Sequence, residues 1–260
     1  MTISGLIGLA FILVFFGLII ISAASRRSRP GANLRAIPAF TKLRRAIDLA
    51  VESGSRLHIS IGRGNITGPK SSAAFVGLSM LGRMAQSTSA GDSPPIATTG
   101  DPALAILARD TLSGTYRDIG MIDHYDPTAG QLLGFTPFSY AAGALPVASA
   151  EKSAANILAG SFGSEVALLT DAGERGGNLT LAGTDNISAQ AILYATAHEP
   201  LIGEELYAGG AYVQAGPMHA ASLRAQDVIR WLLVAAILGG IVIKVLGFEQ
   251  IIIDTLKGLL

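Results

Sequence analysis

Cysteine is absent from this 260-residue chain, and its absence excludes disulfide bonds, thiolate metal sites and cysteine nucleophiles. Charge is also scarce, because only 15% of the residues are charged and the formal net charge is zero. This neutral balance argues against nucleic acid as a partner, since nucleic-acid-binding surfaces carry an excess of lysine and arginine. The lack of cysteine leaves the cellular compartment open, because a cysteine-free protein tolerates either redox environment.

Apolar residues are abundant instead, at 50% of the chain, and the mean hydropathy is +0.47. Such a composition predicts membrane segments. The first, Ile3 to Ala23, has no charged residue and is long enough to cross a hydrocarbon core of about 30 Å. A cleaved signal peptide is the alternative, but it needs positive charge before its apolar run. Here the arginines follow the run, so we expect a retained anchor.

A second apolar run covers residues 228–248. Trp231 lies at its beginning, where aromatic residues mark the membrane interface. Lys244 lies near its far end, where the ammonium group can reach the headgroups. The alternative, an ion-pathway residue, would need an acidic partner in one of the spans, and neither span has one.

Basic residues predict the direction of both spans. Seven follow the first span, namely Arg26, Arg27, Arg29, Arg35, Lys42, Arg44 and Arg45. Arg224 and Arg230 precede the second span, and the outer flanks add only Lys257. The positive-inside rule therefore predicts an inner (cytoplasmic) membrane protein with a cytoplasmic centre and both termini outside. The lipid bilayer is then a partner, anchored on Arg26, Arg27, Trp231 and Lys244.

These signals divide the chain into five segments. We expect an N-terminal transmembrane helix (1–25), a basic linker with a juxtamembrane helix (26–56), a cytoplasmic α/β domain (57–222), a second transmembrane helix (228–248) and an amphipathic tail (249–260). The apolar stripe of the tail predicts that it lies in the outer interface or packs on a neighbouring subunit.

Strand and helix patterns alternate between the spans. The sequence predicts strands at 57–61, 95–99, 165–170 and 178–182, and helices at 40–52, 72–86, 101–116, 148–158 and 186–197. Asp101-Pro102 is a strong helix start, and Asp185 or Asn186 caps a later helix. Such alternation predicts a mostly parallel sheet flanked by helices.

Several motifs resemble those of a known group of proteins. These are Ile37-Pro-Ala39, Gly183-Thr184, the run from Leu201 to Tyr212, and Leu223-Arg-Ala-Gln-Asp227. From these residues the chain resembles an uncharacterised family of membrane-anchored bacterial proteins found mostly in Chloroflexota-type bacteria. The resemblance covers roughly Asn33 to the second span and implies membrane anchoring. It implies no activity, so no functional residue is carried over.

The segment from Gly62 to Ser71 follows a predicted strand, as a phosphate-binding loop would. It departs from the P-loop pattern because Pro69 separates Gly68 from Lys70 and removes a backbone N–H. Polar loops that open helices predict a ligand crevice at the strand ends, formed by Gly62, Gly64, Thr99, Asp101, Thr184 and Asp185. Helix capping accounts for the same residues equally well.

The last part of the domain offers a candidate subunit contact, made of Glu204, Glu205, Tyr207 and Tyr212. The two glutamates also fit the first turn of a helix, where the helix dipole favours acids. The four histidines (His58, His124, His198 and His219) are scattered and predict neither a metal site nor a proton-transfer site. No cofactor and no catalytic residue is therefore expected.

Two functions remain from these patterns. The first is a non-enzymatic, membrane-anchored scaffold that self-associates through its cytoplasmic domain into a homo-oligomer or larger membrane assembly. The second is a membrane-tethered α/β domain that binds or transforms a small molecule in the crevice. A transporter is a weaker third option, because two spans with one isolated charge offer little to line a path.

Overall fold

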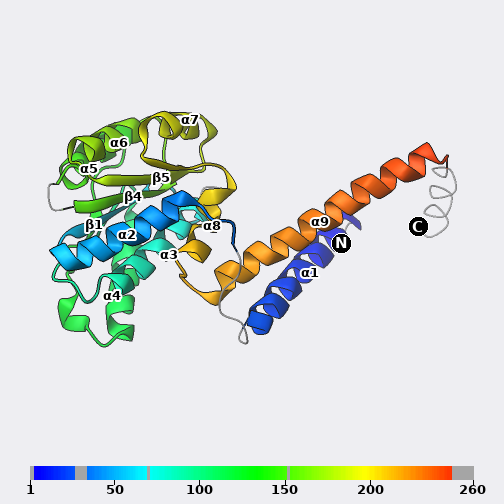
Figure 1. Ribbon diagram of the computed structural model, residues 1–260, viewed down its shortest axis with the longest axis horizontal. Helices are drawn as coiled ribbons and strands as arrows, with labels where there is room; N and C mark the ends of the chain where they lie inside the picture. The colour runs from blue at the N-terminus through cyan, green and yellow to red at the C-terminus, as the bar shows by residue number, and fades with distance from the viewer. Residues whose placement is uncertain (1–2, 27–33, 69–70, 151–152, 248–260) are drawn as a thin grey trace. The chain divides into compact units, whose positions relative to one another are not determined.

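The computed structural model describes residues 3–26, 34–68, 71–150 and 153–247 (Figure 1). The chain forms two compact units. The central unit extends from Asn33 to Gly216, and the end unit combines residues 1–32 with residues 217–260. The sequence predicts that the α/β domain covers residues 57–222. The central unit begins earlier, at Asn33, within the segment predicted as a linker and juxtamembrane helix, and it ends earlier, at Gly216.

A parallel sheet forms the middle layer of the central unit. Its six strands are β1 (Arg56–Gly62), β2 (Ile96–Thr99), β3 (Gly130–Leu132), β4 (Ser153–Ser161), β5 (Leu179–Thr184) and β6 (Glu199–Leu201). They lie in the order β3-β2-β1-β4-β5-β6, and every neighbouring pair is parallel. The expected α/β fold class is confirmed.

Helices cover both faces of this sheet (Figure 1). One face carries α2 (Pro38–Ser53), α3 (Ser71–Ser87), α4 (Pro102–Asp118) and α8 (Glu204–Tyr212). The other face carries α5 (Pro137–Ala148), α6 (Val166–Arg175) and α7 (Ile187–Thr196). A short 3₁₀ turn, Ile122–His124, follows α4. Because side chains alternate along a strand, Ile157 joins the first core and Leu158 the second.

Polar side chains begin several of the helices. Asp101 accepts a hydrogen bond from the Leu104 amide (3.0 Å) at the start of α4, as the sequence predicts. Thr136 and Ser139 form a reciprocal capping box at the start of α5. Of the two predicted caps for α7, Asn186 is the one used, because its side chain accepts from the amides of Ser188 and Ala189.

Two predicted elements are wrong. Residues 148–158 were expected to form a helix, but most of them lie in β4, between β1 and β5. Alanine favours helices, yet the burial of eight of the nine residues of β4 between two strands outweighs that local preference. Residues 165–170 were expected to form a strand, but they open α6. A short continuous apolar run does not distinguish a buried strand from a buried helix.

The end unit contains α1 (Ile3–Arg26) and α9 (Pro217–Val245), which contact each other. Figure 1 shows that they run in opposite directions, so the end of α1 lies near the start of α9. Both are long and apolar enough to cross a membrane. The second helix begins at Pro217, well before the predicted position 228. The apolar pattern did not reveal this start, because the first turns of the helix are polar.

The predicted anchoring residues fall within or beside these helices. Trp231 and Lys244 are exposed on α9, and Arg26 is the last residue of α1. Arg27 and the whole of the predicted amphipathic tail, residues 249–260, lie outside the described residues.

Candidate functional site

The strand order reverses between β1 and β4. The chain leaves β1 towards α3 on one face of the sheet and leaves β4 towards α6 on the opposite face. In open α/β sheets, diverging connections of this kind leave a crevice outside the carboxyl ends of the two strands, where ligands bind. We call the end of the sheet at which the parallel strands have their carboxyl ends the carboxyl edge.

Backbone groups of three strands converge at the carboxyl edge. The Gly62 carbonyl accepts hydrogen bonds from the Thr99 hydroxyl (2.9 Å) and the Gly100 amide (2.9 Å). The Arg63 amide donates to the Ser161 carbonyl (2.9 Å). Gly62 has a φ of +72°, and a Cβ atom there would collide with the Ser161 carbonyl. A glycine is therefore required where β1 passes the end of β4.

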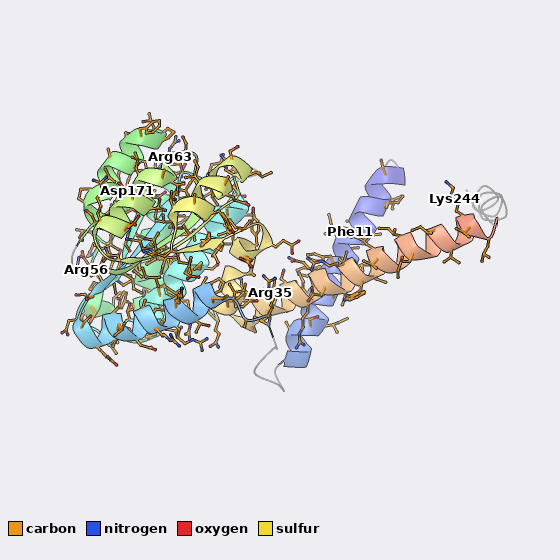
Figure 2. The ribbon with its side chains drawn as sticks, turned by 45° about the horizontal axis from the view of Figure 1, so that its top comes forward. Phe11, Arg35, Arg56, Arg63, Asp171 and Lys244 are labelled. Carbon is orange, nitrogen blue, oxygen red and sulfur yellow. The ribbon has the colours of Figure 1, made fainter. Side chains whose placement is uncertain are left out.

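Arg63 lies directly after β1 at this edge (Figure 2). One of its terminal nitrogens, Nη2, donates to the Phe135 carbonyl (2.6 Å), and its stem lies over Gly100. Its Nε atom is buried and has no hydrogen-bond partner in the described part of the chain. Among the same residues, no carboxylate forms an ion pair with Arg63. The edge thus contains a cationic group with an unused donor.

The predicted crevice residues all follow strands at this edge, but their roles differ. The Thr99 hydroxyl accepts from the Asp101 amide (3.2 Å) in addition to its bond to Gly62, and Asp101 caps α4. The Thr184 hydroxyl accepts from the Phe162 amide (3.0 Å) and donates to the Phe162 carbonyl (3.2 Å). Both threonines are buried and hold loops in place.

Asp185 differs from these capping and loop-holding residues. Its Oδ1 atom is buried without a hydrogen-bond partner among the described residues, so it can accept a hydrogen bond. Gly64 is buried beside Arg63, while Pro69 and Lys70, farther along the same loop, lie outside the described residues. The structure therefore brings all six predicted residues to one edge, with Asp185 separated from Arg63 by β4.

Sequence reasoning missed the loop after β4, because that segment was expected to lead into another strand. Glu165 is buried there, and its carboxylate accepts from the Gly163 amide (2.9 Å). The Nε atom of Arg63, which has no hydrogen-bond partner among the described residues, was also missed. An arginine directly after a buried strand at a glycine-rich turn was the available signal.

A buried polar network lies between the sheet and α5, on the face of the sheet that α5 covers. His58 bonds to Asn156 (2.9 Å) through Nδ1 and to Thr98 (2.8 Å) through Nε2. The Tyr140 hydroxyl bonds to Ser60 and to the Thr98 hydroxyl (3.1 Å). Burial lowers the pKa of His58 to about 4 and raises the pKa of Tyr140. The network is therefore neutral, and it fixes α5 against the sheet.

The two ends of the central unit are fastened to each other. The Tyr212 hydroxyl donates to the Arg35 carbonyl (2.6 Å), and its ring stacks on Phe40 with centroids 4.7 Å apart. Arg35 also forms an ion pair with Glu205. We call these four residues the clasp. Two of the residues predicted to contact another subunit, Glu205 and Tyr212, are thus engaged within the chain, while Tyr207 is exposed on α8.

Two cavities lie away from the carboxyl edge. One of about 440 Å³ opens at the amino ends of β1, β2 and β4, with Arg56 and His58 in its lining. Another of about 380 Å³ lies between α2, α3 and the end of α8. Across the described ranges, no group of three or more histidine or acidic side chains is placed to hold a metal ion.

The chain belongs to the family described as a domain of unknown function, DUF6754, which matches residues 2–255. The expected membership of an uncharacterised family is thereby confirmed. No curated protein and no solved structure matches the chain.

Proposed function

We propose that the central unit binds a small phosphorylated molecule at the carboxyl edge, tethered to a membrane by α1 and α9. The observation that carries this proposal is the unpaired Nε of Arg63 at the point where the strand order reverses. Burying part of a guanidinium without a carboxylate is costly, and an anionic ligand would remove that cost. Arginine also matches the paired oxygens of phosphate.

Asp185 supports a ligand with hydroxyl groups. Its buried Oδ1 has no partner among the described residues and can accept a hydrogen bond from a hydroxyl group. In dinucleotide-binding sheets an acidic side chain at a strand end accepts from a ribose hydroxyl. A sugar phosphate or a nucleotide would therefore satisfy Arg63 with its phosphate and Asp185 with a hydroxyl. The proposal is limited to binding, because no nucleophile–base pair lies at this edge within the described ranges.

Thermal unfolding of the purified full chain tests this function. Glucose 6-phosphate, ATP and inorganic phosphate would each be titrated in a non-ionic detergent. A ligand at a hundred times its Kd adds about 2.7 kcal/mol, which raises the Tm by about 5 °C or more in a unit of this size.

The comparison variant is Arg63→Gln, in which the ligand should no longer raise the Tm. Arg117→Gln serves as the matched control, because Arg117 is exposed in the last turn of α4. The absence of any stabilisation, or a shift that survives Arg63→Gln, would contradict the proposal.

A self-associating scaffold is the second candidate. It is favoured by glycines on the two apolar helices: Gly8, Gly239 and Gly240 have no described atom within 4 Å of a Cβ added to them. Small residues let helices approach closely in lipid, so a second copy could pack there. Tyr207, exposed on α8, offers a separate contact position on the central unit.

Mass photometry after extraction in mild detergent distinguishes this candidate. We expect a defined oligomer for the natural chain and a shift to monomer for Gly239→Leu, with Leu238→Ile as the volume-matched control. A monodisperse monomer for the natural chain would exclude the scaffold.

The orientation in the membrane is also a proposal. We infer a bacterial inner membrane with the central unit in the cytoplasm and both termini outside. The basic residues that flank the central unit support this, because such residues remain on the cytoplasmic side. The opposite directions of α1 and α9 fit two crossings that begin and end on one side.

A further inference from the structure

The carboxyl edge is lined by large apolar side chains that are open to solvent. Phe135 is 66% exposed, Phe138 is 63% exposed and Ile187 is 83% exposed. Ile66, Phe75 and Leu168 are also exposed. All six follow strands, either in the connecting loop or in the first two turns of the next helix. We call this set the apolar rim.

The apolar rim extends along the carboxyl edge from the loop after β3 to the first residue of α7, and Phe135 is the member joined to the unpaired cation. The Phe135 carbonyl is the acceptor that holds the Arg63 guanidinium (2.6 Å), and Phe138 follows in the first turn of α5. Ile66 lies three residues after Arg63 in the same loop. A ligand bound to Arg63 would therefore have exposed apolar side chains beside it.

A phosphorylated sugar would leave this rim uncovered. Large exposed apolar patches mark binding sites on proteins, and six large apolar side chains are exposed at the carboxyl ends of these strands. The base of a nucleotide could stack on Phe135 or Phe138, but Ile66, Leu168 and Ile187 offer aliphatic branches, which suit a hydrocarbon chain. The proposed membrane tether, formed by two helices long and apolar enough to span, would hold the chain where such molecules are abundant.

We propose that the ligand of the carboxyl edge is an anionic amphiphile, a lipid phosphate whose headgroup pairs with Arg63 and whose chains lie on the apolar rim. This inference rests on the proposed function and specifies its substrate class. Charge complementarity identifies the occupant, because Arg63, a cation whose Nε has no partner among the described residues, lies at the same edge as the exposed apolar side chains.

The test uses the full chain in nanodiscs of phosphatidylcholine, with unfolding followed by circular dichroism. Four probes would be titrated: glycerol 3-phosphate, dihexanoyl phosphatidic acid, dihexanoyl phosphatidylcholine and ATP. We expect dihexanoyl phosphatidic acid to stabilise the protein at concentrations at least about tenfold lower than glycerol 3-phosphate, because only the former covers apolar surface. The neutral phosphatidylcholine should have no effect.

Two exposed positions allow a variant that should fold normally. The double variant Phe135→Ser, Phe138→Ser should lose the advantage of phosphatidic acid and keep the response to glycerol 3-phosphate. Tyr194→Ser is the matched control, since Tyr194 is an exposed aromatic near the far end of α7. It should leave both responses unchanged.

Each remaining outcome is informative. Equal responses to glycerol 3-phosphate and phosphatidic acid, or a tighter response to ATP, would overturn the lipid inference and retain the proposed function. An effect of phosphatidylcholine equal to that of phosphatidic acid would remove the role of the anionic headgroup. No response to any probe would overturn both proposals.

Discussion

His58 is a histidine that the fold holds uncharged. It is fully buried between Asn156 and Thr98, and burial lowers its pKa from 6.5 to about 4. The unfolded chain therefore binds a proton at a pH where the folded chain does not. The resulting stabilisation is complete above pH 6.5 and is lost as the pH falls towards 4.

Acidification should accordingly weaken the central unit. Between pH 7 and pH 4.5 we expect His58 to contribute a loss of about 2–3 kcal/mol in the free energy of unfolding. Denaturant titrations at several pH values measure this dependence. The variant His58→Gln keeps hydrogen-bonding groups but does not titrate. Its free energy of unfolding should therefore fall less between pH 7 and pH 4.5, by the amount that His58 contributes. Identical slopes for both proteins would show that His58 is not the titrating group.

Tyr140 provides a second prediction at this scale. Its buried hydroxyl bonds to Ser60 and Thr98, so Tyr140→Phe removes a donor and leaves two hydroxyls with fewer partners. We expect a loss of about 1–3 kcal/mol in unfolding free energy. Ser60→Ala should cost less when Tyr140 is already phenylalanine, because the two side chains share one hydrogen bond. Strict additivity in this cycle would show that the contact is energetically unimportant.

Among the elements, the clasp is the contact that joins the two ends of the central unit. Tyr212→Phe keeps the ring stacked on Phe40 and removes the hydrogen bond to the Arg35 carbonyl. We expect a modest loss of about 1 kcal/mol, with faster amide exchange in residues 34–37. Tyr207→Phe, on the exposed side of α8, is the control and should change neither quantity.

Sequence patterns predicted the helices and strands whose own residues determine their conformation. The Asp101-Pro102 start of α4 and the apolar alternation of β1 are examples. They failed for β4, whose alanines become a strand only because β1 and β5 lie on either side of it. The short edge strands β3 and β6 were missed for a different reason, because a run of three residues has almost no periodicity.

The candidate site was predictable only in part. Loops that follow parallel strands meet at one edge, so the six predicted residues are found together there. The strand order was not predictable from local patterns, and the order is what places Arg63 beside the end of β4. The unpaired Nε of Arg63 depends on every neighbour of that side chain, which no spacing of residues reveals.

For the whole molecule, the absence of cysteine permits a direct test of orientation. A single cysteine at exposed Ser188 in the central unit should react with a membrane-impermeant maleimide only after cells are opened. A cysteine at Thr2 should react in intact cells, because the proposed topology places it outside. Labelling of Ser188→Cys from outside would reverse the proposed topology.

The clasp joins residues 177 positions apart in the chain. During synthesis, α1 leaves the ribosome long before Tyr212, so under the proposed topology the first helix would enter the membrane while the central unit is still incomplete. The bond between Tyr212 and Arg35 can form only when nearly all of the sheet has emerged and α9 is about to follow. Under the proposed topology, the central unit would thus complete its fold only as the second helix emerges from the ribosome.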